Sequence, residues 1–199
     1  TIRVGIIGYG GFGRFLHRAW SHVDGAEVSA VADMAPEGVP DGVRTHQAWS
    51  DLLDSQAVDV VSIATPPSSH AAIAIAALEQ GIHVLVEKPL ATSLSDAQSI
   101  LDARDKSGCI ATVNFMLRFN PIISAVHDWC RSGVFGSLQR VVVENYAQDE
   151  TLGPDHWFWD QKVSGGILVE HGVHFFDIVN GCTSATVTRV DRRSWPRNR

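Results

Sequence analysis

The sequence contains little sulfur chemistry, with only three cysteines and two methionines among its 199 residues. The cysteines, Cys109, Cys130 and Cys182, are odd in number and form no C-x-x-C pair. This pattern argues against a disulfide framework and predicts buried or free thiols in a reducing cytosol. No apolar run approaches the ~20 residues of a membrane-spanning helix, and no signal peptide precedes the first predicted strand. We therefore expect a cytoplasmic protein without a membrane partner.

Basic charge is scarce as well. Lys and Arg number 16 against 22 Asp and Glu, which gives a net charge of −6. This balance provides no general reason to expect nucleic acid as a partner. Five arginines do gather in residues 189–199, and we interpret them as a solvated end, with an acidic partner or nucleic acid as the alternative. With 45% hydrophobic residues, the chain can build one globular domain and part of a second.

A glycine cluster near the start follows the pattern G-x-G-x-x-G. An apolar run at 2–7 enters the cluster, and residues 12–23 then have a helical pattern. In this strand–turn–helix context the first glycine allows a tight turn, the second leaves room for a pyrophosphate, and the third lets helix and strand pack closely. The start of the helix adds free N–H groups that favour phosphate. A flexible glycine loop is the alternative. We assign to a dinucleotide site Gly8, Gly10, Gly11, Phe12 and Gly13.

Asp33 supports this assignment. It follows a second apolar segment, 26–32, and lies twenty residues beyond the last glycine of the motif. A carboxylate there can accept hydrogen bonds from the adenosine ribose hydroxyls and repels a 2′-phosphate. This favours NAD as the cofactor over NADP. The alternative is an exposed aspartate at the end of a strand.

A regular alternation of strands and helices predicts a doubly wound parallel sheet. The predicted strands are 2–7, 26–32, 43–45, 58–64, 82–86 and 110–114, and the predicted helices are 12–23, 47–53, 70–80 and one capped by Ser93 or Ser95 that ends at 107. Ligands of such sheets bind outside the carboxyl ends of the strands. The unusual residues of this chain gather at those ends, which points to a nucleotide site with chemistry beside it.

A helix from Pro121 to Cys130 follows the last of these strands, and the character of the chain changes after Arg131-Ser-Gly133. A long strand at 138–146 and a helix at 167–180 then predict the start of a second domain with its own sheet. The fold class is thus α/β, a Rossmann domain at 1–121 followed by a partial α+β domain at 122–199. A lone strand cannot bury both faces of a sheet. We therefore expect a homo-oligomer completed through the C-terminal sheet, or partial disorder of that region.

Several motifs together resemble one family. They are Gly8-x-Gly10-x-x-Gly13, Ala64-Thr-Pro-Pro67 with His70, Glu87-Lys-Pro89, Arg118-Phe-Asn-Pro121, and Gly165-Gly166 followed by Gly172-x-His174-x-x-Asp177. In order and spacing they resemble the Gfo/Idh/MocA family of NAD(P)-dependent oxidoreductases over about residues 2–182. The resemblance implies a C-terminal open mixed sheet that often forms the oligomer interface. It also implies substrates that are sugars, inositols or related polyols.

Lys88 is the first candidate for chemistry. It precedes a proline at the end of a predicted parallel strand, where its ammonium can polarise a carbonyl or stabilise an alkoxide. By the family pattern it is the catalytic lysine, and the Lys88–Pro89 peptide is cis. The alternative is a surface pair of Lys88 with Glu87. The same motifs place around the cofactor Thr65, Pro66, His70, Glu87 and Lys88; a rigid turn is the alternative for Thr65 and Pro66.

Three polar residues of the last predicted helix, Glu170, His174 and Asp177, lie at i, i+4 and i+7 and share one face. A histidine beside a carboxylate can exchange a hydroxyl proton. By the family pattern His174 is the acid/base, and position 170 commonly carries Asp, so Glu170 departs from it. The alternatives are a core or capping histidine and a structural hydrogen bond by Asp177. His171 points about 60° away from His174, and no metal site is expected.

Further residues are candidates for the substrate side. Asn114 ends a strand, and Arg118 belongs to a segment that lines the substrate in the family; loop scaffolding is the alternative for both. Trp157 and Trp159 can stack on a sugar face, or they can pack between domains.

The sequence therefore predicts an enzyme that transfers a hydride between NAD and a sugar, inositol or related polyol. One alternative is a non-catalytic nucleotide-binding or regulatory protein, which the short C-terminus favours and the retained Lys88 and His174 oppose. Another is an NAD-dependent glycosidase-type relative.

Overall fold

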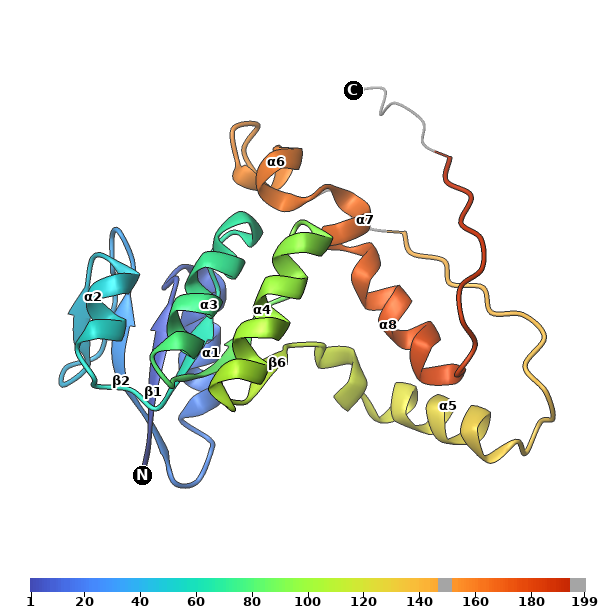
Figure 1. The fold of residues 1–199 in the computed structure, drawn as a ribbon, viewed down its shortest axis with the longest axis horizontal. Helices are drawn as coiled ribbons and strands as arrows, with labels where there is room; N and C mark the ends of the chain where they lie inside the picture. Colours follow the sequence, from blue (N-terminus) through green and yellow to red (C-terminus); the bar gives the residue numbers. More distant parts are fainter. Residues whose placement is uncertain (147–151, 194–199) are drawn as a thin grey trace. The chain divides into compact units, whose positions relative to one another are not determined.

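The computed structural model describes residues 1–146 and 152–193 and divides into two compact units (Figure 1). The first unit contains residues 1–115 and 146–173, and the second contains 116–145 and 174–199. Within the described ranges, no helix combines the length and the apolar character that crossing a bilayer requires. The predicted domain boundary at 121 stays a prediction, because these units interleave along the chain.

The first unit is built on a parallel sheet of six strands with the order β3-β2-β1-β4-β5-β6. The strands are β1 (Ile2–Ile7), β2 (Ala26–Ala32), β3 (Arg44–His46), β4 (Val60–Ile63), β5 (His83–Val86) and β6 (Ala111–Val113). In the inner strands β1, β4 and β5, the side chains of Val4, Val61 and Val84 are fully buried. Burial on both faces explains the near-continuous apolar runs. The predicted Rossmann-type sheet is confirmed.

Helices connect these strands and lie along the sheet (Figure 1). They are α1 (Gly11–Trp20), α2 (Trp49–Asp54), α3 (His70–Glu79) and α4 (Leu94–Ser107), with the short 3-10 helix η1 (Pro67–Ser69) before α3. Ser93 caps α4, because its hydroxyl accepts a hydrogen bond from the N–H of Asp96 at 3.1 Å. The strand order reverses at β1, whose neighbours are β2 and β4. A crevice for a ligand forms at this point of such sheets.

A later segment of the chain returns to the first unit. It contains the 3-10 helix η3 (Trp157–Trp159), α6 (Gln161–Ser164) and α7 (Ile167–Glu170). Asp160 begins α6 by accepting a hydrogen bond from the N–H of Lys162 at 2.8 Å. Since α6 packs against η1, this segment lies beside a loop at the carboxyl edge of the sheet.

The second unit contains the 3-10 helix η2 (Met116–Phe119), α5 (Pro121–Ser132) and the part of α8 (Gly172–Cys182) that begins at His174. The predicted strand at 138–146 is wrong: these residues form neither helix nor strand and are exposed. A strand needs a neighbour to pair its N–H and C=O groups. In the described residues, every strand pair lies within the sheet formed by β1 to β6, and none of these pairs includes residues 138–146.

The predicted single helix at 167–180 is also wrong in one respect. It is interrupted at His171, which lies between the end of α7 at Glu170 and the start of α8 at Gly172. Glycine is a poor helix former because it loses the most backbone freedom on folding. Glu170 and His174 therefore belong to two helices, α7 and α8.

Candidate active site

The glycine turn after β1 has the geometry that a dinucleotide requires. Gly8 has a φ of +89°, and a Cβ there would lie 2.7 Å from the carbonyl carbon and oxygen of Ala64. A Cβ on Gly13 would lie 1.9 Å from the carbonyl oxygen of Gly8. Both positions thus exclude any side chain, for the reasons that the sequence predicted.

The start of α1 is open. A Cβ on Gly10 or Gly11 would meet nothing within 4 Å, and no side chain caps the helix at Gly10. The first N–H groups of a helix have no partner inside the helix. Together with the positive end of the helix dipole they suit a phosphate. The residues present therefore fit the pyrophosphate of a dinucleotide.

Asp33 lies beside this turn. Its Oδ2 accepts a hydrogen bond from the N–H of Tyr9 at 2.6 Å, and its Oδ1 accepts one from the N–H of Ala35 at 2.9 Å. An ionised carboxylate has about four acceptor sites, so two bonds leave capacity for ribose hydroxyls. The two backbone bonds hold the carboxylate at the edge of the glycine turn.

His70 has a different place from the one predicted. Its side chain is fully buried, with Nδ1 2.8 Å from the carbonyl oxygen of Pro89 and Nε2 2.8 Å from that of Thr65. Burial lowers the pKa of His70. The hydrogen bonds to the two carbonyls partly offset this lowering, and the charge of Lys88 adds to it. A side chain with no exposed surface does not touch a cofactor. The assignment of His70 as a direct cofactor contact is therefore corrected: it ties the loop after β4 to the loop after β5.

Glu87 and Asn114 are paired with each other. The amide Nδ2 of Asn114 donates to Oε1 of Glu87 at 2.6 Å, across the ends of β5 and β6. Burial raises the pKa of Glu87, while the hydrogen bond from Asn114 and the charge of Lys88 act in the opposite direction. The predicted roles of Glu87 toward the cofactor and Asn114 toward the substrate stay predictions.

Lys88 follows directly, and the Lys88–Pro89 peptide is cis, as the resemblance implied. Its Nζ donates to the carboxylate of Glu170 and to the carbonyl oxygen of the same residue, the latter at 3.1 Å. The Lys88 side chain is only 19% exposed. The alternative of a surface pair with Glu87 is wrong, because the ammonium forms its ion pair with Glu170 and is largely buried.

Glu170 is shared between two partners. It is buried, with one carboxylate oxygen on Lys88 and the other, Oε2, 2.5 Å from Nδ1 of His171. Burial alone would raise the pKa of Glu170, but the hydrogen bonds from Lys88 and His171 together hold that pKa below its usual value. Sequence reasoning set His171 aside because it assumed an unbroken helix. The glycine that follows it was the available signal that the helix breaks there.

Two aromatic residues predicted to line the substrate belong to η3 in the first unit. Trp157 and Trp159 are both half-buried, and each packs edge to face with Phe158, at centroid distances of 6.2 and 4.9 Å. The indole N–H of Trp159 donates to the carbonyl oxygen of Gly153 at 3.0 Å. Their stacking on a sugar stays a prediction.

The remaining predicted residues lie in the second unit. Arg118 grips the buried carboxylate of Asp177 with two hydrogen bonds, of which Nε to Oδ2 is 2.8 Å long. This pair is the kind of structural hydrogen bond named as the alternative for Asp177, and the substrate roles of Asp177 and Arg118 stay predictions. His174 lies on α8 in the same unit, and its proton exchange stays a prediction.

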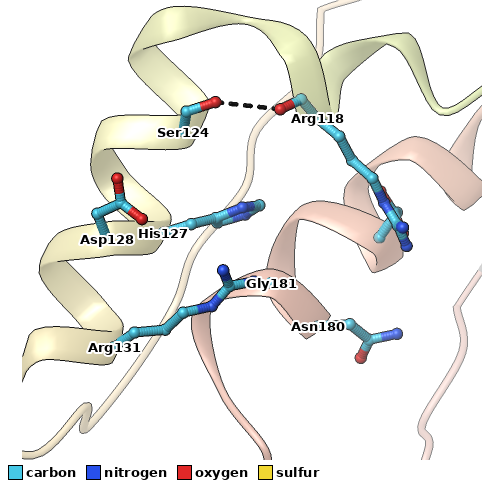
Figure 2. A pocket seen from close by; sticks show the side chains of 8 residues that line it. Arg118, Ser124, His127, Asp128, Arg131, Asn180 and Gly181 are labelled. Atoms are coloured by element: carbon cyan, nitrogen blue, oxygen red, sulfur yellow. Dashed lines mark hydrogen bonds and ion pairs between the residues drawn. The ribbon is translucent and has the colours of Figure 1, made fainter.

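A cavity of about 350 Å³ adjoins this ion pair (Figure 2). Figure 2 shows the imidazole ring of His127 and the guanidinium group of Arg131 extending from α5 toward the end of α8. His127 is buried, and its Nε2 lies 2.9 Å from the carbonyl oxygen of Ile178. Among the described residues of the chain, no group of three His, Cys, Asp or Glu is arranged to hold a metal ion.

Comparison with known proteins agrees with this architecture. Residues 2–115 match the sequence model described as an oxidoreductase family with an NAD-binding Rossmann fold, and residues 123–194 match the C-terminal domain model of the same family. Together the two matches cover most of the chain, including the glycine turn, Asp33 and Lys88.

The similar proteins include a glycosyl hydrolase and two dehydrogenases. The chain is 28% identical to glycosyl hydrolase family 109 protein 1 of Bacteroides thetaiotaomicron, over 98% of this chain and 47% of that protein. It is 28% identical to the NAD(+)-dependent scyllo-inositol 2-dehydrogenase of Bacillus subtilis, over 95% of this chain and 56% of that protein. A levoglucosan dehydrogenase solved with NADH and L-sorbose has a TM-score of 0.78 at 25% identity, covering 92% of this chain and 53% of its own. The chain spans about half the length of the curated relatives it matches.

Proposed function

The chain belongs to the Gfo/Idh/MocA oxidoreductase family, and on this premise we propose that it takes part in NAD-dependent oxidation or reduction of a sugar, an inositol or a related polyol. Its single strongest support is Lys88, a half-buried ammonium at the carboxyl end of β5 in the same unit as an intact glycine turn. The inositol and levoglucosan dehydrogenases among its relatives agree with this substrate class.

When bound, NAD supplies the hydride acceptor, or as NADH the donor. The residues of the chain supply the rest. The start of α1 holds the pyrophosphate, and Asp33 accepts hydrogen bonds from the ribose. Lys88 stabilises the substrate oxygen as charge develops on it, and Glu170 holds the lysine in place. His174 exchanges the hydroxyl proton.

The choice of NAD over NADP follows from charge. Asp33 is already held by two N–H groups, and a phosphate on the ribose would bring a second anion against it. Titration of the protein with NADH and with NADPH measures this preference directly. Binding is monitored by quenching of the protein's fluorescence or by the fluorescence of the cofactor.

A glycosidase-type reaction is the second candidate, because one similar relative is a family 109 glycosyl hydrolase. Both reactions use the same cofactor site, so binding does not separate them. Product analysis after incubation with an aryl glycoside does: free phenol identifies cleavage, whereas net NADH formation from a polyol identifies a dehydrogenase.

The decisive experiment is cofactor binding followed by a screen of sugars and polyols. We expect NADH to bind and at least one polyol to be turned over. Lys88→Ala should lower turnover by about 10²–10³-fold, the size of losing one electrostatic group at the reacting oxygen. Cofactor binding without turnover across the panel would instead support a non-catalytic nucleotide-binding protein.

We also propose that the chain assembles with copies of itself through its second unit. Large apolar side chains are exposed there, with Phe119 at 82%, Ile122 at 73% and Phe135 at 80%. Exposed apolar clusters mark interaction surfaces. Sedimentation velocity over a range of concentrations tests this, and a monomer at every concentration contradicts it.

A further inference from the structure

The carboxylate of Glu170 connects Lys88 to a residue that no step above uses. One oxygen accepts from the Lys88 ammonium, and the other lies 2.5 Å from Nδ1 of His171. We propose that His171 is a positioning residue for Lys88, acting through Glu170. The lysine's task rests on the proposed function, whereas the arrangement of the three side chains does not.

The protonation of the ring follows from its partner. An ionised carboxylate only accepts hydrogen bonds, so Nδ1 of His171 carries the hydrogen in this pair. The His171 side chain as a whole is 31% exposed. The histidine thus presents one donor to a buried carboxylate from a side chain that solvent partly reaches.

The pairing depends on the break between α7 and α8. Neighbouring residues of a continuous helix point about 100° apart, and their side chains do not meet. His171 is the C-terminal capping residue of α7, with φ −104° and ψ −44°, and the next helix starts at Gly172. The ring is also packed edge-on against Phe158, with centroids 6.0 Å apart. The break and this aromatic contact together aim the imidazole at Glu170.

Without His171 the carboxylate would be held at one oxygen only. Glu170 is buried, and a buried acceptor without a partner is costly. The side chain would then rotate or take up a proton, and either change weakens its hold on Lys88. An aspartate is one methylene shorter, so the longer glutamate at this position suits a carboxylate that must reach two partners.

The matched variants are His171→Leu and His171→Asn. Leucine and asparagine have nearly the same shape, but only asparagine keeps an N–H donor close to the position of Nδ1. The first readout needs neither cofactor nor substrate: the rate at which acetic anhydride labels Lys88, with Lys106 on α4 as the internal reference. We expect faster labelling of Lys88 in His171→Leu by about tenfold, the equivalent of one hydrogen bond to a charged group, and a near wild-type rate in His171→Asn.

A second readout addresses catalysis. In His171→Leu we expect kcat to fall by a similar factor while KM and NADH affinity change less than twofold, with recovery in His171→Asn. Equal Lys88 labelling in the wild type and both variants, with the circular dichroism spectra unchanged, overturns the proposal. If His171→Leu does not fold, Glu170→Gln serves in its place: it keeps the shape and removes the charge, and labelling of Lys88 as slow as in the wild type is the overturning result. Absence of NADH binding in the wild type would refute the proposed function while leaving the labelling comparison intact.

Discussion

The carbonyl oxygen of Gly8 fills the space that a side chain on residue 13 would need, because an ideal Cβ there would lie 1.9 Å from it. We predict that Gly13→Ala disrupts the turn and lowers the free energy of unfolding by about 1–3 kcal/mol, the usual cost of overpacking a well-packed site. Gly11→Ala is the matched control, since a Cβ at residue 11 meets nothing within 4 Å. Urea denaturation measures both; equal midpoints would contradict the prediction.

A substitution at Gly10 tests cofactor binding separately from the stability of the fold. A Cβ there meets nothing within 4 Å in the protein itself, so Gly10→Ala should leave the urea midpoint nearly unchanged. The methyl group would instead lie where the pyrophosphate approaches the backbone. We expect NADH affinity to fall by about tenfold or more, equivalent to one lost phosphate contact. A titration showing unchanged NADH affinity would place the phosphates elsewhere.

Asp33 sets the preference between cofactors. Asp33→Asn keeps an oxygen acceptor for the N–H of Tyr9 but removes the negative charge. We expect NADH to bind about tenfold more weakly, and NADPH to be less affected because its repulsion disappears. The ratio of the two dissociation constants is the measurement. An unchanged ratio would show that the carboxylate does not face the ribose.

Gly181 is required by the ring of His127. A Cβ there would lie 2.1 Å from the ring carbon Cε1 and 2.3 Å from Nε2, which also contacts the carbonyl oxygen of Ile178. Gly181→Ala should therefore lower the free energy of unfolding by about 1–3 kcal/mol. Asn180→Ala, at an exposed neighbouring position, serves as the control. Thermal and urea denaturation that leave the two variants equally stable would argue against this packing.

Acid should weaken the link between β1 and the start of β4. Three hydrogen bonds from Arg3, two from its side chain and one from its backbone N–H, hold the pKa of Asp59 at about 2. A depressed carboxyl pKa stabilises the fold above the unfolded value of ~3.9, and this stabilisation disappears as pH falls toward 2. Asp59→Asn should be less stable than the wild type at pH 7, and the difference should shrink between pH 4 and pH 2. Because the pair is partly exposed, we expect a small effect, and denaturation curves at several pH values measure it.

The sheet and the glycine turn were predictable because their determinants are local. Residues 2–7 and 58–64 are apolar runs whose burial on both faces needs no knowledge of distant partners. The glycines of the turn are fixed by sterics within a few residues of chain, Gly8 against Ala64 being the one longer contact. The resemblance to the family predicted the cis peptide and the position of Lys88, which composition alone does not specify.

The errors arose where the outcome depends on something outside the segment. Residues 138–146 have a strand-like pattern, but a strand exists only when a neighbour pairs with it. The helix at 167–180 was expected from its period, and the break before Gly172 overrides that period at one residue. His171, which lies in this break, contacts the carboxylate of Glu170. His70 was assigned to the cofactor by its motif, whereas two carbonyl oxygens hold it inside the protein.

The two backbone N–H groups on Asp33 have a consequence for the thermodynamics of cofactor capture. A carboxylate that accepts a hydrogen bond at each oxygen has already lost its rotational freedom in the free protein. Little further conformational entropy is therefore lost when the ribose binds. Calorimetry should therefore show a smaller unfavourable entropy for NADH in the wild type than in a variant whose turn lets this side chain swing.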